Sequence, residues 1–256
     1  MRDIDKVLLN RKSNRKYEKG LDLNIVKDSV KIAQRTACSM NAQQISIILI
    51  TDQDKLNKIS ENNWNQPHIK ECEAFLLYCI DHNRQQAVIE DSNNTMHIQD
   101  DIESIVVASI DAGLIAQSVE LLLQAQDIGT CYIGGVRNNI KEIASLVNLE
   151  GISTPILGQA IGMPQGGIIN KVEDIRPRVQ FDSFFFEENY QIDKVKQGAI
   201  DYSKDLTKWW SNKGKSEHQS YAESMNKSYI KSYIPNLFED LQEMGYLSDY
   251  EKKDKQ

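Results

Sequence analysis

The sequence predicts a globular protein that combines α-helices with buried β-strands, in one large domain or two small ones. Its 256 residues are enough for a sizeable core, since single cores stop growing above roughly 250 residues. Hydrophobic residues make up 40% and charged residues 26%, close to the averages of globular proteins. The chain contains apolar residues at helical spacing and short apolar runs between polar turns, which indicates both kinds of element.

The first predicted elements are a helix and two strands. Residues 22–36 have apolar side chains at helical spacing, with Asp22 or Asn24 as the N-cap. Residues 45–50, ISIILI, and 74–80, AFLLYCI, are short, rich in β-branched or aromatic side chains and bounded by polar turns. These two runs predict buried strands, and we expect both to lie in the centre of a sheet.

Residues 100–126 predict a long helix. Asp100 and Glu103 have the spacing of a capping box, and the helix is apolar on nearly all sides. A single domain could bury such a helix at its centre, and a dimer interface could bury it as well. We do not expect it to span a membrane, because ionisable and amide groups at this frequency are costly in hydrocarbon. These interrupting residues are Asp111, Gln117, Glu120 and Gln124.

The next predicted elements surround a pair of glycines. We expect the long helix to stop at Gly129 as its C′ residue, and residues 130–133, TCYI, to form a strand that runs into Gly134 and Gly135. Asn138 or Asn139 then caps a further helix. Residues 154–164, TPILGQAIGMP, predict another apolar strand.

The composition changes beyond about residue 187. Charged and polar residues dominate there, but aromatic residues recur, which is typical of an extension that packs on its own core or on a partner subunit. We expect a helix over residues 217–243, kinked or restarted by Pro235. The predicted division is therefore a core over residues 1–186 and an extension over residues 187–256.

Several classes of function are disfavoured. A net charge of −7 argues against binding to nucleic acid or to an anionic membrane, since both need a broad basic face. The start of the sequence is charged and has no apolar leader segment, so we expect a cytoplasmic protein. The four cysteines and four histidines lack metal-ligand spacing, and motifs for dinucleotide binding, P-loops, zinc proteases and serine hydrolases are missing. We expect no metal site and no catalytic triad.

Basic residues nevertheless gather at three places in this acidic chain. They suit a phosphate, because the arginine fork binds phosphate oxygens in pairs and bare glycine backbone presents N–H groups to an anion. Solvated surface charge is the alternative interpretation for each cluster. The clusters are Arg11, Lys12, Arg15 and Lys16; Arg137 beside the two glycines; and Arg176 with Arg178. The loops at residues 36–44 and 64–71 add small and amide side chains that could line a ligand.

The order of these segments resembles the nitroreductase superfamily, in its branch of oxygen-insensitive NADPH nitroreductases and NADPH:FMN oxidoreductases. The similarity extends from about residue 3 to about residue 245, and YIGGVRNN with the paired basic residues around Pro177 is its most specific part. The segments that carry it are NRKSNRKY, TACSMNAQQISIILITD, QPHIKECEAFLLYCIDHNR, ASIDAGLIAQSVELLLQAQDIGTCYIGGVRNNI, PILGQAIGMP and DIRPRV.

The resemblance implies an α+β fold with a mainly antiparallel sheet, an intertwined homodimer and one FMN in each of two interface sites. It implies that both ends of the chain meet at the flavin phosphate and that Gly134 and Gly135 let a strand end approach the ring. The implied FMN contacts are Arg11, Lys12, Ser13, Arg15, Cys38, Ser39, Met40, Gln43, Gln66, Tyr132, Ile133, Gly134, Gly135, Arg176 and Arg178. The family's usual early motif is H-R-S-x-R, so Arg11 here replaces a histidine.

The resemblance also implies a reaction. Hydride would pass from NADPH, or from NADH, to flavin N5, and then two electrons would pass to a nitroaromatic, a quinone or a free flavin in a ping-pong cycle. The cofactor carries this chemistry, so no catalytic side chain is expected. Lys213 and Lys215 are candidates for the extra phosphate of NADPH. A flavin-binding protein with little turnover and an interaction protein without flavin are the alternatives.

Overall fold

The computed structural model describes residues 4–167, 175–215, 220–232 and 234–248. The chain divides into two compact units. The first unit comprises residues 1–169 and 236–256, and the second unit comprises residues 170–235. The expected division at residue 187 concerned an extension that packs on the core or on a partner, and it stays a prediction.

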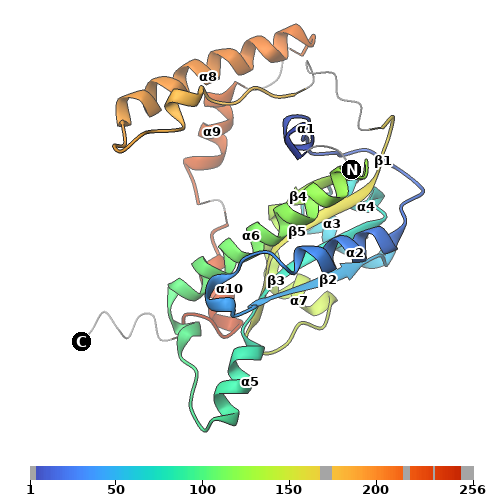
Figure 1. Cartoon of the computed structure of the whole chain (residues 1–256), viewed down its shortest axis with the longest axis vertical. Coiled ribbons are helices and arrows are strands. Elements are labelled where there is room, and N and C mark those ends of the chain that lie inside the picture. Colours follow the sequence, from blue (N-terminus) through green and yellow to red (C-terminus); the bar gives the residue numbers. More distant parts are fainter. Residues whose placement is uncertain (1–3, 168–174, 216–219, 233, 249–256) are drawn as a thin grey trace. The chain divides into compact units, whose positions relative to one another are not determined.

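The first unit is built on a sheet in which all the described strand pairs are antiparallel. The order is β1-β5-β3-β2, and β4 pairs with β5 beside β1 (Figure 1). This confirms the predicted mainly antiparallel sheet and the four predicted strands, at residues 45–50, 74–80, 130–133 and 154–164. The strands are β1 (Tyr17–Glu18), β2 (Ile45–Ile50), β3 (Ala74–Asp81), β4 (Gly129–Ile133) and β5 (Ser153–Pro164).

The prediction that both early strands are central is correct for β3 and wrong for β2. β3 lies between β5 and β2, and seven of its eight residues are buried. β2 pairs only with β3 among the described residues and is the edge of the sheet, with five of its six residues only partly buried. An apolar β-branched run therefore predicted the strand but not its place, because edge and centre differ in long-range pairing that the run does not contain.

Helices cover both faces of this sheet (Figure 1). Alternate residues of β3 enter two separate apolar cores: Phe75, Leu77 and Cys79 pack with α3, α4 and α7, whereas Leu76 and Tyr78 pack with α2 and α6. Successive side chains of a strand point to opposite faces of the sheet, so β3 contributes to the apolar core on each face. The helices of the first unit are α1 (Ile4–Leu9), α2 (Leu23–Ala33), α3 (Gln53–Glu61), α4 (Pro67–Glu71), α5 (Asn83–Asp91), α6 (Ile102–Gln124), α7 (Ile140–Leu146) and α10 (Leu237–Glu243).

The helix caps match the sequence at two of four predicted places. Asp22 caps α2 by accepting from the N–H of Asn24, and Asn139 caps α7 by accepting from the N–H of Glu142. α6 begins one residue later than predicted, because Asp101 and not Asp100 is its N-cap. Gly129 does not end α6 but starts β4; Asp127, with φ of 62°, is the left-handed residue after the helix.

Within one chain α6 is buried on one side and exposed on another, so the core buries part of this apolar helix, and burial of the rest in a dimer interface stays a prediction. Ile102, Val106, Ile110 and Leu114 are 45% to 57% exposed and follow one another at intervals of four residues, which places them in one stripe. By length and apolar composition α6 could cross a membrane, but the core helix of a globular fold has the same composition. The buried face of α6 packs against α2 and the sheet.

The second unit contains η5 (Phe181–Ser183), α8 (Ile192–Asn212) and α9 (Tyr221–Tyr229). α8 was not predicted, although Ile192, Val195, Ala199, Tyr202, Leu206 and Trp209 follow one another at helical spacing between charged residues. The helix predicted over residues 217–243, kinked or restarted by Pro235, is present as two helices: α9 starts at a capping box of Ser220 and Glu223, and α10 is a separate helix of the first unit. Pro235 lies between them, as its effect on a helix requires.

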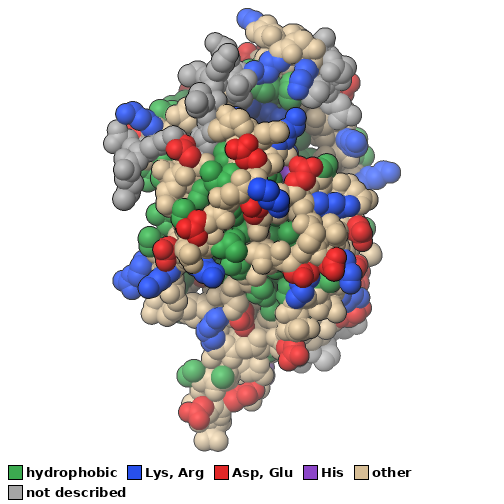
Figure 2. Space-filling model, turned by 90° about the vertical axis from the view of Figure 1, so that its right-hand side faces the viewer, with side chains coloured by type: hydrophobic (Ala, Val, Ile, Leu, Met, Phe, Trp, Pro, Cys, Tyr) green, Lys and Arg blue, Asp and Glu red, His purple; other side chains and the backbone are tan. Residues whose placement is uncertain are grey.

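The surface carries both signs of charge. On the face in Figure 2, acidic and basic side chains are interspersed and hydrophobic side chains gather between them.

Candidate functional site

The first predicted basic cluster lies beside strand β4. The backbone N–H of Asn14 donates to the carbonyl of Thr130 at 2.8 Å, and the Tyr17 hydroxyl donates to the carbonyl of Asn14 at 2.7 Å. Asn14 itself is buried. These bonds fix the segment between α1 and β1 along the start of β4, so the flanking side chains of Ser13 and Arg15 are held next to that strand.

Arg11 is paired with a carboxylate of the long helix. Its Nη1 lies 3.1 Å from Oε1 of Glu120, whose side chain is 1% exposed. The same oxygen accepts from the Thr130 hydroxyl at 2.9 Å and from Nε2 of Gln124 at 3.1 Å. A buried carboxylate needs such partners, because its desolvation is otherwise uncompensated. Arg11 is therefore an anchor of this segment as well as a candidate ligand, at the position where related proteins are expected to have histidine.

Arg15 differs from Arg11 because it forms no ion pair with any described residue and is exposed. Its charge affects its neighbours. Burial and then the charge of Arg15 lower the pKa of His68. Burial raises the pKa of Cys131, while the charge of Arg15 and the hydroxyl of Ser13 oppose that rise. The region beside β4 thus has a positive potential and a guanidinium that can receive an anion.

Gly134 and Gly135 differ in what a side chain at each position would contact. A Cβ on Gly135 would lie 2.1 Å from Oδ1 of Asn63, which is fully buried, so packing within the chain already requires glycine there. A Cβ on Gly134 would meet only the mobile end of Arg137, at 3.3 Å. Arg137 donates to the carbonyl of Ile156 at 2.6 Å, so it serves β5 and is not a free cation for a phosphate. Gly134 is consequently the glycine that leaves backbone accessible to a ligand.

The strand that leads to these glycines supplies Tyr132 and Ile133. Ile133 is 3% exposed and belongs to the core with α3 and α4, so its backbone, and not its side chain, is the part that a ligand could contact. Burial and then the charge of Glu120 raise the pKa of Tyr132 well above its usual range, which keeps the phenol neutral.

Gln66 lies at the start of α4, after two residues in an unusual conformation. Trp64 and Asn65 both have φ of 55°, a left-handed conformation that is uncommon outside glycine. The carbonyl of Gln66 accepts from the hydroxyl of Ser60 at 2.9 Å. Its side-chain amide is half-buried and makes no hydrogen bond within the described part of the chain, so it is available to a polar ligand edge.

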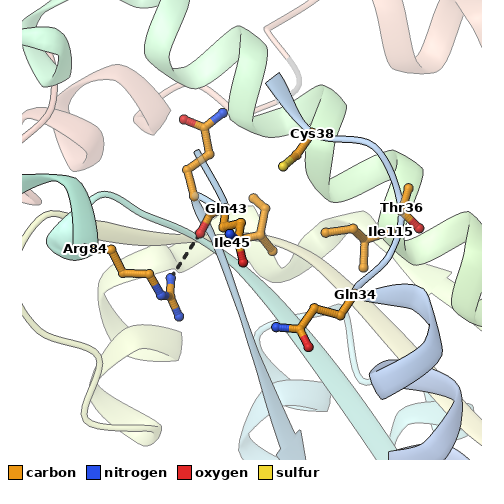
Figure 3. Close-up of a pocket in the computed structure, with 8 residues that line it drawn as sticks. Gln34, Thr36, Cys38, Gln43, Ile45, Arg84 and Ile115 are labelled. Carbon is orange, nitrogen blue, oxygen red and sulfur yellow. Dashed lines mark hydrogen bonds between the residues drawn. The ribbon is translucent and has the colours of Figure 1, made fainter. Parts of the chain in front are cut away.

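The predicted loop of Cys38, Ser39, Met40 and Gln43 also contains residues in the left-handed conformation. Met40, Asn41 and Gln43 have φ of 49°, 53° and 53°, and Met40 is 93% exposed. Left-handed non-glycine residues cost energy and tend to persist at functional sites. A cavity of about 90 Å³ is lined by Cys38 and Gln43 together with Gln34, Thr36, Gln44, Ile45, Arg84 and Ile115. Figure 3 shows side chains that line it.

The two sets of predicted residues lie at different positions along α6. The loop is bonded to Asp111, because the N–H of Ser39 donates to Oδ1 at 3.2 Å. Arg11 is bonded to Glu120, nine residues and therefore about 13.5 Å further along the helix axis. Within one chain the loop and the early basic cluster are thus attached to separate parts of the same helix.

The remaining predicted basic residues form a cluster inside the second unit. Arg176 lies 5.3 Å from the ring centre of Trp210, Lys213 lies 5.1 Å from that of Trp209, and Lys215 lies 5.9 Å from that of Trp210. Such distances are those of cation–π contacts. Arg178 donates to the carbonyls of Arg176 and Pro177. The convergence of this cluster with Arg11 and Arg15 on one phosphate stays a prediction.

Comparison with known proteins places these features in a family. The profile of the nitroreductase family matches residues 8–163. The chain belongs to the nitroreductase family. Its curated relatives include FMN reductase [NAD(P)H] of Bacillus subtilis, 28% identical, and FMN reductase (NADPH) of the same organism, 25% identical. The matches cover 96% and 91% of this chain and 98% and 97% of those proteins. A solved structure of NfrA2 from B. megaterium superposes with a TM-score of 0.89 at 25% identity, covering 96% of this chain and 98% of that one.

The predicted family and the α+β fold of this nitroreductase-family chain are confirmed. Two residues at the site were not predicted to act there: Asp111 and Glu120 appeared in the sequence only as interruptions of an apolar helix. That interruption was itself the signal, since a buried carboxylate on such a helix requires a partner. No group of three or more potential metal ligands occurs among the residues that the structure describes.

Proposed function

We propose that this nitroreductase-family chain is an FMN-dependent NAD(P)H oxidoreductase. The observation that carries the proposal is the exposed Arg15 guanidinium, unpaired among the described residues, which follows the segment bonded to strand β4 at Thr130. The FMN reductases among its relatives match this chain over nearly their whole length, which supports the same activity.

The donors of this site fit FMN by their chemistry. A phosphate needs cations and hydrogen-bond donors, which Arg15, Lys12 and Ser13 offer on one segment. A flavin ring needs neutral donors and acceptors at its edge and open backbone beside it. The side-chain amide of Gln66 and the backbone of Gly134 supply these. The loop of Cys38, Ser39, Met40 and Gln43 would add a second wall.

When bound, FMN supplies hydride and two-electron transfer between a nicotinamide and an oxidised acceptor. The residues of the chain bind and orient it. Arg15 and Lys12 neutralise negative charge, and a neutral Tyr132 avoids adding a negative charge beside Glu120. His68, whose pKa is lowered by burial and by Arg15, stays neutral at pH 7 and so does not repel the cations.

We further propose a homodimer with the site at its interface. The stripe of Ile102, Val106, Ile110 and Leu114 on α6 is an exposed apolar surface of the kind that subunit interfaces cover. The attachment of the loop and of Arg11 to separate parts of α6 supports a site that takes the loop from one subunit and the basic cluster from the other.

The proposed acceptors are nitroaromatics, quinones and free flavins, and the proposed reductant is NADPH, with NADH as the alternative. Lys213 and Lys215 lie together on the Trp209 and Trp210 rings, which supports a positively charged surface for the extra phosphate of NADPH. Charge reversal at both lysines should raise the KM for NADPH and leave that for NADH unchanged.

The deciding experiment uses the purified full chain under anaerobic conditions. We expect a yellow protein, or one that takes up added FMN, whose absorbance near the flavin maximum is bleached by NADPH and restored by a quinone. A yellow protein inert to NADPH and NADH would mean a flavin-binding protein with little turnover. A colourless protein that rejects FMN would overturn the proposal.

A further inference from the structure

A buried row of polar side chains supports the loop of Cys38, Ser39, Met40 and Gln43, and no step of the proposed reaction uses it. It starts at Asp111 of α6, which is 2% exposed. Oδ1 of Asp111 accepts from the backbone N–H of Ser39 at 3.2 Å, and Oδ2 accepts from Nε2 of Gln44 at 2.9 Å. One carboxylate thus holds both ends of the loop.

The row continues away from the loop to the carboxyl-terminal part of the chain. Oε1 of Gln44 lies 3.2 Å from Nε2 of His82, and Nδ1 of His82 lies 3.2 Å from the hydroxyl of Tyr246. Gln44, His82 and Tyr246 are 7%, 1% and 0% exposed. Tyr246 follows α10, so the row joins residues that are 207 positions apart in sequence, from Ser39 to Tyr246.

The carboxylate at one end sets the direction of every hydrogen bond. Asp111 can only accept, so the Gln44 amide must turn its nitrogen to Asp111 and its oxygen to His82. Nε2 of His82 must then carry a proton and donate. For a neutral ring, Nδ1 becomes an acceptor and receives the proton of the Tyr246 hydroxyl.

The alternative partner of that hydroxyl does not disturb this arrangement. The Tyr246 hydroxyl also lies 3.0 Å from the carbonyl of Ile152. That carbonyl already accepts from the backbone N–H of His82 at 2.9 Å, so it keeps a partner when Tyr246 donates to the ring. Burial lowers the pKa of His82 and the charge of Asp81 only partly opposes this, so the ring is neutral near pH 7. Tyr246, His82 and Gln44 then each donate a hydrogen bond to the next residue of the row, and the row ends at Asp111.

The chain segment around His82 holds the loop by further contacts. Arg84 of α5 donates to the carbonyl of Gln43 at 3.4 Å, and Gln85 donates to the carbonyl of Ala42. Arg84 also pairs with Asp81 at 3.4 Å. The left-handed residues of the loop are therefore held from the α6 side by Asp111 and from the α5 side by residues that follow β3.

We propose that Asp111 is a positioning residue of the flavin site. It fixes the Ser39–Gln43 backbone and the direction in which hydrogen bonds are donated along the row, from Tyr246 through His82 and Gln44 to Asp111. The flavin part of this inference rests on the proposed function. Asp111 does not touch the reacting atoms; it acts through Ser39 and Gln44.

The direction of donation along the row is tested by the tautomer of His82 in Asp111→Asn. The introduced amide can still accept from Ser39 but now donates toward Gln44. Gln44 must then reverse, and His82 must move its proton from Nε2 to Nδ1 and donate to Tyr246, whose hydroxyl turns to the Ile152 carbonyl. Nitrogen-15 NMR of the imidazole should report Nε2–H in the parent protein and Nδ1–H in the variant. The control Asp101→Asn, at the exposed N-cap of the same helix, should keep Nε2–H.

Rescue provides a second arm. In Asp111→Asn combined with Gln44→Glu, the new carboxylate accepts from both sides, so Nε2–H of His82 should return. An unchanged tautomer in Asp111→Asn, or no return in the double variant, would overturn the assigned direction. Neither measurement needs bound flavin, so both remain decisive if the protein proves not to bind FMN.

The positioning of the loop is tested by Asp111→Leu, with Gln117→Leu on the same helix as the control. We expect faster amide hydrogen exchange at Ser39 in the flavin-free protein and an FMN dissociation constant raised at least about tenfold, the loss of one hydrogen bond to a charged group. Unchanged exchange and unchanged FMN affinity in a folded Asp111→Leu protein would refute the positioning role. If Asp111→Leu loses protection at Ser39 and the parent protein never binds FMN, the loop support stands and the proposed function is overturned.

Discussion

The pair of Arg11 and Glu120 gives the most direct test of how the site is supported. Replacing Arg11 by alanine removes the cation that faces Glu120 at 3.1 Å and leaves a carboxylate that is 1% exposed. Breaking a buried pair by removing one partner costs about 3 to 5 kcal/mol. Arg11 is 25% exposed, so water can replace part of its charge, and Thr130 and Gln124 continue to donate to Glu120. We therefore expect about 2 to 4 kcal/mol of lost unfolding free energy.

A loss of this size is measurable by heat or by urea. For a domain of 150 to 250 residues, 1 kcal/mol corresponds to about 2 to 4 °C in Tm, so the melting temperature should fall by on the order of 10 °C. The double variant Arg11→Ala with Glu120→Gln removes the stranded charge, and it should recover most of the loss. With the single variant Glu120→Gln measured as well, the double-mutant cycle gives the coupling energy of the pair.

Two results would refute this reasoning. If Arg11→Ala melted within about 1 °C of the parent protein, water would already satisfy Glu120 and the pair would contribute little. If the double variant were as unstable as Arg11→Ala, the loss would come from the packing of the arginine stem and not from the carboxylate. Melting should be followed without added FMN, because a bound ligand would mask the effect.

Three further predictions concern separate parts of the site. Arg15→Ala should weaken FMN binding by about 1.5 to 3 kcal/mol, the range for hydrogen bonds to charged groups, with little change in Tm; fluorescence titration would expose an error if affinity stayed constant. Gly135→Ala should cost about 1 to 3 kcal/mol of stability, because its Cβ would lie 2.1 Å from an oxygen of buried Asn63; a urea midpoint equal to that of the parent would contradict this. His68 and His82 have lowered pKa values in the folded state, so below about pH 6.5 the unfolded chain binds protons that the folded chain does not. The free energy of unfolding should therefore fall by up to about 1.4 kcal/mol per pH unit for each histidine as the pH is lowered. Urea unfolding should give a lower free energy of unfolding at pH 5.5 than at pH 8.

Local signals in the sequence were sufficient for the elements with strong patterns. ISIILI and AFLLYCI became β2 and β3, and Asp22 and Asn139 cap the helices that they precede. One error occurs where two neighbouring residues can serve the same purpose. Asp100 and Asp101 are both good caps, and the structure uses the second while Asp100 accepts from Ser248, far away in sequence. No local pattern distinguishes such a pair.

Local sequence patterns predict even less of the contacts at the candidate site. Resemblance predicted which residues contact the flavin, and this stays a prediction; it did not predict which residues hold them in place. Arg11 and Glu120 are 109 positions apart, and the partners of Asp111 lie 67 and 72 positions away. The charged residue inside an apolar helix was visible in the sequence, whereas its partner was not, because the pairing depends on how the sheet brings distant loops to the helix.

α6 links these observations. A helix that is largely apolar keeps two buried carboxylates, although each costs desolvation energy and an apolar replacement is often neutral or stabilising for the fold alone. Each carboxylate holds one of the two segments that are proposed to contact FMN: Asp111 holds the loop at Ser39, and Glu120 holds Arg11. A helix selected only for packing would gain from leucine at both positions. The two carboxylates are better explained by the segments that they hold in place. Variants of Asp111 and of Glu120 should therefore weaken FMN binding through different segments. The losses in binding free energy should add if α6 itself does not move.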